Sequence, residues 1–173
     1  GDSIFMRGFD TQSSIYVDGI RDLGTISRDT FNTEQVEIAK GPAGVDNGRG
    51  SSSGYINLTS KMAGLEDFTA GSVTVGTGAH KRVTADVNRA LSVENAAVRV
   101  NLLRQDSGVV GRDVVENNTT GIATSLAFGL DTDTRTTLNL LHVQQDNIPD
   151  GGISTAGLPG YYSATYKAAF PNN

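Results

Sequence analysis

Two neighbouring stretches decide the fold of this chain: Val36–Gly44 reads V-E-I-A-K-G-P-A-G, and Arg49–Lys61 reads R-G-S-S-S-G-Y-I-N-L-T-S-K. In the first, Val36, Ile38 and the stem of Lys40 predict a strand that Gly41-Pro42 ends, because proline cannot donate to the ladder. In the second, small residues lead into another predicted strand, Tyr55 to Ser60. The pattern is therefore a strand, a break and a second strand.

The residues before these stretches predict short elements of mixed type. Ile4–Phe9 and Ser14–Val17 are expected to form short strands, and Asp18-Gly19 a tight turn. Asp29–Gln35 is expected to form a short helical turn. About sixty residues with so few large apolar side chains would bury too little surface to fold alone. We therefore expect residues 1–62 to pack against a surrounding protein surface.

From Phe68 onward the chain changes character. It divides into segments of about ten residues with loose alternation, which is the signature of a membrane-spanning β-barrel. The five predicted strands are Phe68–Val75, Arg82–Leu91, Ala96–Arg104, Thr120–Leu130 and Arg135–Gln145.

Alternation within these segments separates an apolar face from a polar or small-residue face. Val83, Ala85 and Val87 share one face of the second strand, while Arg82, Thr84, Asp86 and Asn88 share the other. The fifth strand is less regular, because Leu138, Leu140, Leu141 and Val143 do not keep to one face. A soluble antiparallel sandwich alternates in the same way, so the pattern alone leaves both architectures open.

The connections favour the barrel. Ser92–Asn95 and Asp131–Asp133 predict tight turns, whereas Asp106–Thr119 and the stretch from Asp146 onward predict long loops rich in Gly, Asp and Asn. Short turns at one rim and long loops at the other are typical of outer-membrane barrels. The short Gly76–Lys81 link is the exception to this rule.

Composition narrows the function classes. The chain has 173 residues, 37% of them hydrophobic, with 21 Gly and a net charge of -5. Basic residues are neither in excess nor clustered, which argues against nucleic acid as a partner. The absence of Cys excludes disulfides, thiolate metal sites and Cys nucleophiles. Since Gly1 is not an initiator Met and the last residues read as a loop, we interpret the chain as an internal fragment.

Five ordered motifs carry a resemblance to a known family. They are Ile4–Phe9 (I-F-M-R-G-F), Ile15–Gly19 (I-Y-V-D-G), Glu34–Pro42 (E-Q-V-E-I-A-K-G-P), Gly48–Gly50 (G-R-G) and Gly54–Lys61 (G-Y-I-N-L-T-S-K). At this spacing they closely resemble the plug of TonB-dependent outer-membrane receptors. Gly19–Asp22 with Ile26–Asn32 resembles the catecholate siderophore branch. The run Ser51-Ser52-Ser53 departs from the family, which often has Pro or paired Gly there.

The resemblance implies a mostly β fold: the C-terminal half of an α+β plug over residues 1–64, then about five antiparallel strands of an incomplete transmembrane barrel over residues 65–173. It implies an energy-coupled transporter for ferric siderophores in the bacterial outer membrane, with the plug gating the barrel. The implied partners are the ferric siderophore, outer-membrane lipid, and TonB through an N-terminal segment that this chain lacks. No cofactor is expected.

The motif residues are expected to hold or gate the plug. They are Arg7, Gly8, Asp18, Gly19, Glu37, Lys40, Gly41, Pro42, Arg49, Gly50, Gly54 and Asn57. Their charged members, Arg7 and Arg49 above all, can pair with groups on the barrel wall. The competing interpretation is that these charges only solvate the plug surface. The glycines are interpreted as backbone devices.

Ligand contacts are expected from cationic and aromatic side chains, since a ferric catecholate complex is anionic and aromatic. The candidates are Tyr161, Tyr162 and Lys167, followed by Arg21 and Arg28. The tyrosines fit a membrane-interface girdle equally well.

An enzyme is not expected. Gly50–Gly54 matches the G-x-S-x-G pattern of a nucleophile elbow, but a strand follows it where that motif needs a helix. His80 and His142 have no neighbouring residue at metal-ligand spacing, so no metal site is predicted. Two alternatives stay open: a receptor of the same family for another metal chelate, cobalamin or a sugar, and a surface or secreted β-sheet binding protein that does not transport.

Overall fold

The computed structural model describes residues 5–6, 9–10, 14–24, 28–41 and 54–148, and within these it contains three β-sheets. Their strands in chain order are β1 (Phe5–Met6), β2 (Phe9–Asp10), β3 (Ile15–Val17), β4 (Ile20–Arg21), β5 (Thr33–Lys40), β6 (Gly54–Ser60), β7 (Phe68–Val75), β8 (Lys81–Ala90), β9 (Ala96–Asp106), β10 (Gly108–Val109), β11 (Arg112–Phe128) and β12 (Thr136–Ile148). The described residues contain no helix that is long and apolar enough to cross a membrane.

Strands β7 to β12 form one long antiparallel sheet, here called the wall. The order is β7-β8-β9-β11-β12, and the short β10 pairs with β11 beyond the end of β9. The mostly β fold expected from the sequence is confirmed, and the wall is an open sheet in which β7 and β12 are the edges. All five strands expected after residue 67 are present, and the first has the expected bounds.

One predicted loop is wrong. The stretch 106–119 was expected to be a long connection, but β9 continues to Asp106 and the chain reverses at Val110-Gly111 before β11 begins at Arg112. Gly111 supplies the positive φ that this reversal needs, at 77°. The polar residues that look like a loop in the sequence lie on both faces of β11: Glu116 and Asn118 are on the outward face, and Thr119 is buried on the inward face.

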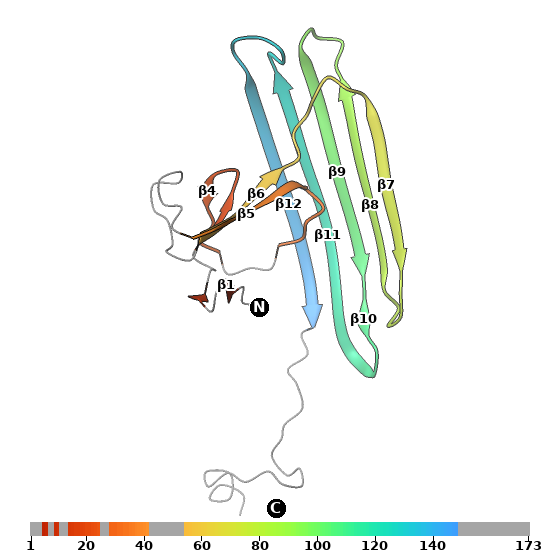
Figure 1. Cartoon of the computed structure of the whole chain (residues 1–173). Helices are drawn as coiled ribbons and strands as arrows, with labels where there is room; N and C mark the ends of the chain where they lie inside the picture. The colour runs from red at the N-terminus through yellow and green to blue at the C-terminus, as the bar shows by residue number, and fades with distance from the viewer. Residues whose placement is uncertain (1–4, 7–8, 11–13, 25–27, 42–53, 149–173) are drawn as a thin grey trace, which may run out of the picture.

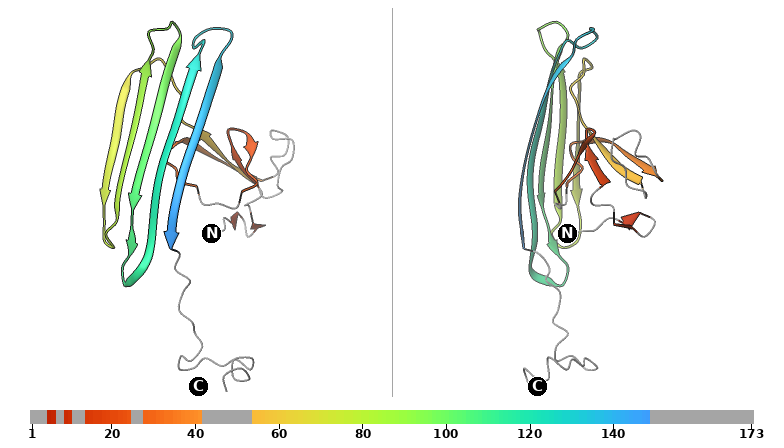
Figure 2. Two further views of the ribbon diagram at one scale, coloured as in Figure 1. Left: turned by 180° about the vertical axis from the view of Figure 1, so that it is seen from behind. Right: turned by 90° about the vertical axis from the view of Figure 1, so that its left-hand side faces the viewer.

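Strands β3 to β6 form a smaller mixed sheet, here called the small sheet. Its order is β4-β3-β6-β5, with β3 and β6 parallel and the other pairs antiparallel. Figure 1 shows this sheet beside the wall, and the edge-on view of Figure 2 places it on one face only. The strands expected at Val36–Lys40 and Tyr55–Ser60 are confirmed as parts of β5 and β6.

Two expectations near the N-terminus need correction. Ile4–Phe9 is not one strand, because β1 and β2 pair with each other as a separate two-stranded sheet. Asp29–Gln35 is not helical. The Asp29 carboxylate accepts the Phe31 N–H at 2.9 Å, the Thr33 N–H donates to the Thr30 carbonyl at 3.0 Å, and β5 begins at Thr33. These bonds close a turn that feeds directly into a strand.

The wall has two distinct faces, as the alternation predicts. Odd-numbered residues of β9 and β11, such as Asn101 and Ala123, are buried against the small sheet, while Leu102 and Ile122 point away from it and are exposed. In β12 the pairing of Ala123 with Leu141 puts Leu141 and Val143 on the inward face and Leu138 and Leu140 on the outward face. The irregular leucines of the sequence thus divide between the two faces.

The turns mark two rims. The connections 76–80 and 107–111 lie at one rim, and 91–95 and 129–135 lie at the other. Because Ile148 pairs with Glu116, β12 ends at the rim of the 107–111 connection. Residues 149–173 lie outside the described part, so the long loop expected after Asp146 stays a prediction.

Candidate functional site between the small sheet and the wall

The first contact between the two sheets is an ion pair from the turn before β5. The Asp29 carboxylate receives two bonds from the Arg82 guanidinium on β8, both 2.7 Å long, and Arg82 also donates to Gln105 on β9 at 2.8 Å. This fork-on-carboxylate geometry is the strong form of a charge-assisted hydrogen bond. The hydrogen bonds from Arg82 hold the pKa of Asp29 below its usual range, so the pair stays ionised at neutral pH.

The second contact is an aromatic ring in a socket. Phe31 is 7% exposed and packs with Leu103 and Ala123 on the wall. Gly121 forms the floor of this socket, since a Cβ there would lie 2.8 Å from Phe31 Cζ and 2.9 Å from Cε1. The ring fits only because Gly121 has no side chain.

The third contact is a network of four charges. Asp86 on β8 accepts Arg99 Nε at 2.9 Å, Arg99 Nη2 at 2.8 Å and Lys61 Nζ at 3.0 Å. Arg99 also reaches Glu34 on β5 at 2.9 Å, and its guanidinium lies 5.0 Å from the centre of the Phe68 ring. Two cations and two anions balance here, so the network links both sheets without net charge.

The fourth contact fixes the chain between β6 and β7. Asn88 is 1% exposed; its side chain accepts the Gly64 N–H at 3.1 Å and donates to the carbonyls of Gly64 and Glu66 at 2.6 Å each. Ser125 accepts the Ala63 N–H at 3.1 Å, and Ala63 packs with Ala97, Ala127 and Leu130. These bonds pair the buried Ala63 N–H and the partly buried backbone groups of Gly64 and Glu66 with side chains of the wall.

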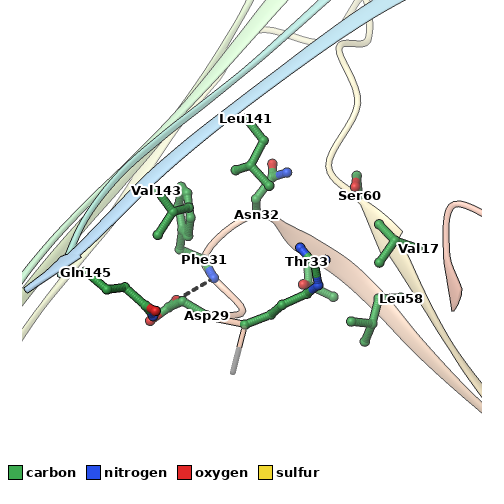
Figure 3. Close-up of a pocket in the computed structure, with 11 residues that line it drawn as sticks. Val17, Asp29, Phe31, Asn32, Thr33, Leu58, Ser60, Leu141, Val143 and Gln145 are labelled. Carbon is green, nitrogen blue, oxygen red and sulfur yellow. Dashed lines mark hydrogen bonds between the residues drawn. The ribbon is translucent and has the colours of Figure 1, made fainter. Parts of the chain in front are cut away.

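A cavity of about 160 Å³ lies between the turn at 28–33 and strand β12. Figure 3 shows Phe31, Leu141 and Val143 on one side of it and Val17 and Leu58 on the other, with Asp29 and Gln145 at one end. Arg28 also lines it. A cavity of this size and apolar lining accommodates about one aromatic ring.

Arg28 is held by one partner, since its Nε donates to Asp22 at 2.5 Å. This bond lowers the pKa of Asp22 and raises the pKa of Arg28, so both stay charged. Among the residues that the structure describes, no other bond to the guanidinium is seen, and its side chain is one-third exposed. Arg28 lines the cavity and Arg21 lies exposed on β4, and the expected role of both as ligand contacts stays a prediction.

Four of the motif residues predicted from the sequence form contacts within the small sheet: Asp18, Gly19, Glu37 and Asn57. Asp18 and Gly19 form the predicted tight turn with φ of 51° and 78°. The Asp18 carboxylate accepts the Ser60 N–H at 2.7 Å, and the Asn57 side chain accepts the Gly19 N–H at 3.2 Å and lies 3.5 Å from Glu37. These residues bind the β3-β4 turn to β6, which is a structural role.

Three further motif residues, Lys40, Gly41 and Gly54, are described by the structure and make none of the contacts with the wall given above. Lys40 is exposed at the end of β5, and Gly41 and Gly54 adopt φ of 108° and 120°, which supports their interpretation as backbone devices. Arg7, Gly8, Pro42, Arg49, Gly50, Tyr161, Tyr162 and Lys167 lie outside the described residues. Their expected roles stay predictions.

Sequence reasoning missed the residues that join the sheets. Asp29, Phe31, Glu34 and Lys61 were not singled out, and neither were their wall partners Arg82, Gly121 and Arg99. The available signal was the polar face of the second wall strand, which predicted an inward side for Arg82, Asp86 and Asn88 but could not name their partners.

Comparison with known proteins decides the family. The family model of the TonB-dependent receptor plug domain matches residues 1–55. Over all 173 residues the chain is 49% identical to the catecholate siderophore receptor Fiu of Escherichia coli K12. This chain belongs to the TonB-dependent receptor family. Its small sheet corresponds to the plug and its wall to the first strands of the barrel, in the bacterial outer membrane.

Two further similarities agree with this assignment. The chain is 43% identical over 154 residues to the probable TonB-dependent siderophore receptor PiuA of Acinetobacter baumannii, covering 88% of this chain and 21% of PiuA. The crystal structure of E. coli Fiu in its open form superposes with a TM-score of 0.83 and 51% identity over 92% of this chain and 24% of that one. The chain spans 23% of the length of the curated Fiu sequence.

Proposed function

We propose that this chain is the region where the plug meets the barrel in an outer-membrane receptor that imports ferric siderophores of the catecholate class. Binding of the ferric complex on the outer side changes plug contacts, and force from TonB moves the plug to open a path. The observation that carries the proposal is the 49% identity to a catecholate siderophore receptor along the whole of this chain.

The division between the two parts falls at residues 64 and 65 in this proposal. Ala63 and Gly64 are bound to the wall by Ser125 and Asn88, and the first wall strand starts shortly afterwards at Phe68. Residues 1–64 then form the plug and residues 65–173 the barrel part.

The charges around the cavity support an anionic ligand. The Asp29 carboxylate is neutralised by Arg82, while Arg28 lines the same cavity as Phe31 and its side chain is one-third exposed. A guanidinium beside an aromatic ring suits an anionic aromatic group. Arg21, Tyr161, Tyr162 and Lys167 complete the proposed set of ligand contacts, and the motif charges Arg7 and Arg49 are proposed to pair with the barrel.

The test uses the full-length receptor in a strain that lacks its own catecholate receptors. Uptake of radioactive iron is measured with ferric catecholates, ferric hydroxamates and other metal chelates, in cells with and without TonB; labelled cobalamin and a sugar are tested in parallel. Uptake of ferric catecholate that requires TonB supports the proposal. Uptake of another substrate alone would assign the receptor to that substrate. A receptor that fractionates outside the outer membrane would favour a non-transport β protein.

A further inference from the structure

The plug touches the wall through two groups of contacts at different distances from the rims, and the Glu34–Arg99 pair links β5 to the Asp86 network of the second group. The 28–31 contact consists of the Asp29–Arg82 pair and Phe31 in the Gly121 socket. The 61–66 contact consists of Lys61 on Asp86 and of Ala63, Gly64 and Glu66 on Ser125 and Asn88. Arg82 and Asp86 lie about 13 Å apart along β8, at roughly 3.3 Å per residue.

The two contacts differ in what separation would expose. The 28–31 contact consists of one ion pair, whose side chains are 16% and 21% exposed, and one ring, Phe31, which is 7% exposed; its described bonds to the wall come from the Asp29 side chain alone. In the 61–66 contact the side chains of Lys61 and Asp86 are 21% and 13% exposed, so the two ion pairs are equally accessible. Here, however, Asn88 is 1% and Ala63 2% exposed, and separation would also break three partly buried hydrogen bonds between Asn88 and the backbone of Gly64 and Glu66. The first contact is the easier one to open.

The cavity beside Phe31 and the chain connections of the two contacts also indicate that the 28–31 contact opens more easily. Phe31 lines the cavity of about 160 Å³ as well as the socket, so the ring has room to turn out of the socket. The 61–66 segment continues directly into wall strand β7, which ties it covalently to the barrel. By contrast, the turn at 28–31 leads into β5, which is an edge strand of the small sheet.

We propose that the 28–31 contact is the releasable latch of the plug and that the 61–66 contact is its fixed hinge. Asp29, Phe31, Arg82 and Gly121 are then positioning residues for gating. This inference rests on the proposed function, because a latch has a role only if the plug moves during import.

A matched pair of cysteine variants tests it in the full-length receptor. Ala123 and Ala127 lie on the same face of β11, and both are buried: Ala123 packs under Phe31 of the latch and Ala127 under Ala63 of the hinge. The 173 residues contain no Cys, so Ala123→Cys and Ala127→Cys each add the only thiol in this region. Labelling by a small maleimide reports how often each contact opens.

In cells importing a ferric catecholate, labelling of Ala123→Cys is expected to rise at least tenfold when TonB is present, while labelling of Ala127→Cys stays within twofold. Equal increases would mean that the whole plug leaves the wall, and no increase at Ala123→Cys would mean that the latch stays closed. Either result overturns the inference. Iron uptake is measured in the same cells, so that a failure of the proposed function appears separately as absent uptake.

A second measurement does not depend on transport. Purified receptor in detergent is labelled across a urea series, and Ala123→Cys is expected to react at lower urea than Ala127→Cys. Simultaneous exposure, or earlier exposure of Ala127→Cys, contradicts the division into latch and hinge. The Phe31→Leu variant, which keeps an apolar side chain but no ring, is expected to shift exposure of Ala123→Cys to lower urea and leave Ala127→Cys unchanged.

Discussion

A methyl group added at Gly121 probes the Phe31 socket directly. The new Cβ of Gly121→Ala would lie 2.8 Å from Phe31 Cζ, so the ring must move, whereas its distance of 3.5 Å from Leu103 Cβ is an ordinary van der Waals contact. Overpacking of this kind costs about 1–3 kcal/mol. In a Phe31→Ala background the clash disappears, and replacing Gly by Ala in a strand is then expected to gain about 0.5–1 kcal/mol. The coupling between the two sites should therefore be roughly 1.5–4 kcal/mol.

The assay is a double-mutant cycle on the full-length receptor. The free energy of opening at the 28–31 contact is measured by hydrogen exchange of the plug peptide that contains Phe31, for wild type, both single variants and the double variant. Gly64→Ala is the matched control, because a Cβ there meets nothing within 4 Å. If Gly121→Ala costs the same with and without the ring, Phe31 does not occupy the socket and the reasoning fails.

Three further predictions follow from other parts of the molecule. Because Arg82 lowers the pKa of Asp29, the stabilisation from this pair should be fully present above pH about 4, near the unfolded-state pKa, and should be lost as pH falls through the lower folded-state pKa. Hydrogen exchange of the same plug peptide should show this loss for the wild type. In Asp29→Asn the peptide should be less protected at neutral pH, and its protection should hardly depend on pH. Val100 faces outward in the middle of β9, so Val100→Arg should cost about 2–4 kcal/mol of barrel stability in lipid. Asn118 faces outward on β11 beyond Thr120, so Asn118→Arg should cost about 1 kcal/mol or less. Equal costs in a urea titration of the receptor in vesicles would contradict a position of Val100 in the middle of the membrane. Changing Tyr161 and Tyr162 together to Ala should weaken ferric-catecholate binding about tenfold, equal to about 1.4 kcal/mol, and unchanged affinity with intact barrel insertion would remove both from the ligand site.

Local pattern was enough to predict most of the strands. Val83, Ala85 and Val87 alternate with polar residues, and a strand with one apolar and one polar face is what such a period of two produces. The Asp18-Gly19 turn is equally local, because only a few residue types accept its positive φ. The family motifs likewise depend on short stretches in fixed order.

Local pattern failed where one sequence suits two conformations. Residues 106–119 carry the Gly, Asp and Asn of a loop, yet pairing with β10 and β12 extends β11 through residues 112–119. The turn before β5 was expected to be helical because a helix and a turn can begin with the same bonds, in which Asp29 and Thr30 accept N–H groups two or three residues ahead. In both cases long-range strand pairing decided the outcome.

The contacts between plug and wall required the tertiary structure. Asp29 and Arg82 are separated by the whole of β5, β6 and β7 in the chain, and nothing in the residues near either one identifies the other as its partner. The same holds for Phe31 and Gly121, since a missing side chain matters only when the fold brings a ring against it. The sequence by itself determined which faces are polar, apolar or small. Which of those faces meet, and which charge neutralises which, follows from long-range packing of the two sheets against each other.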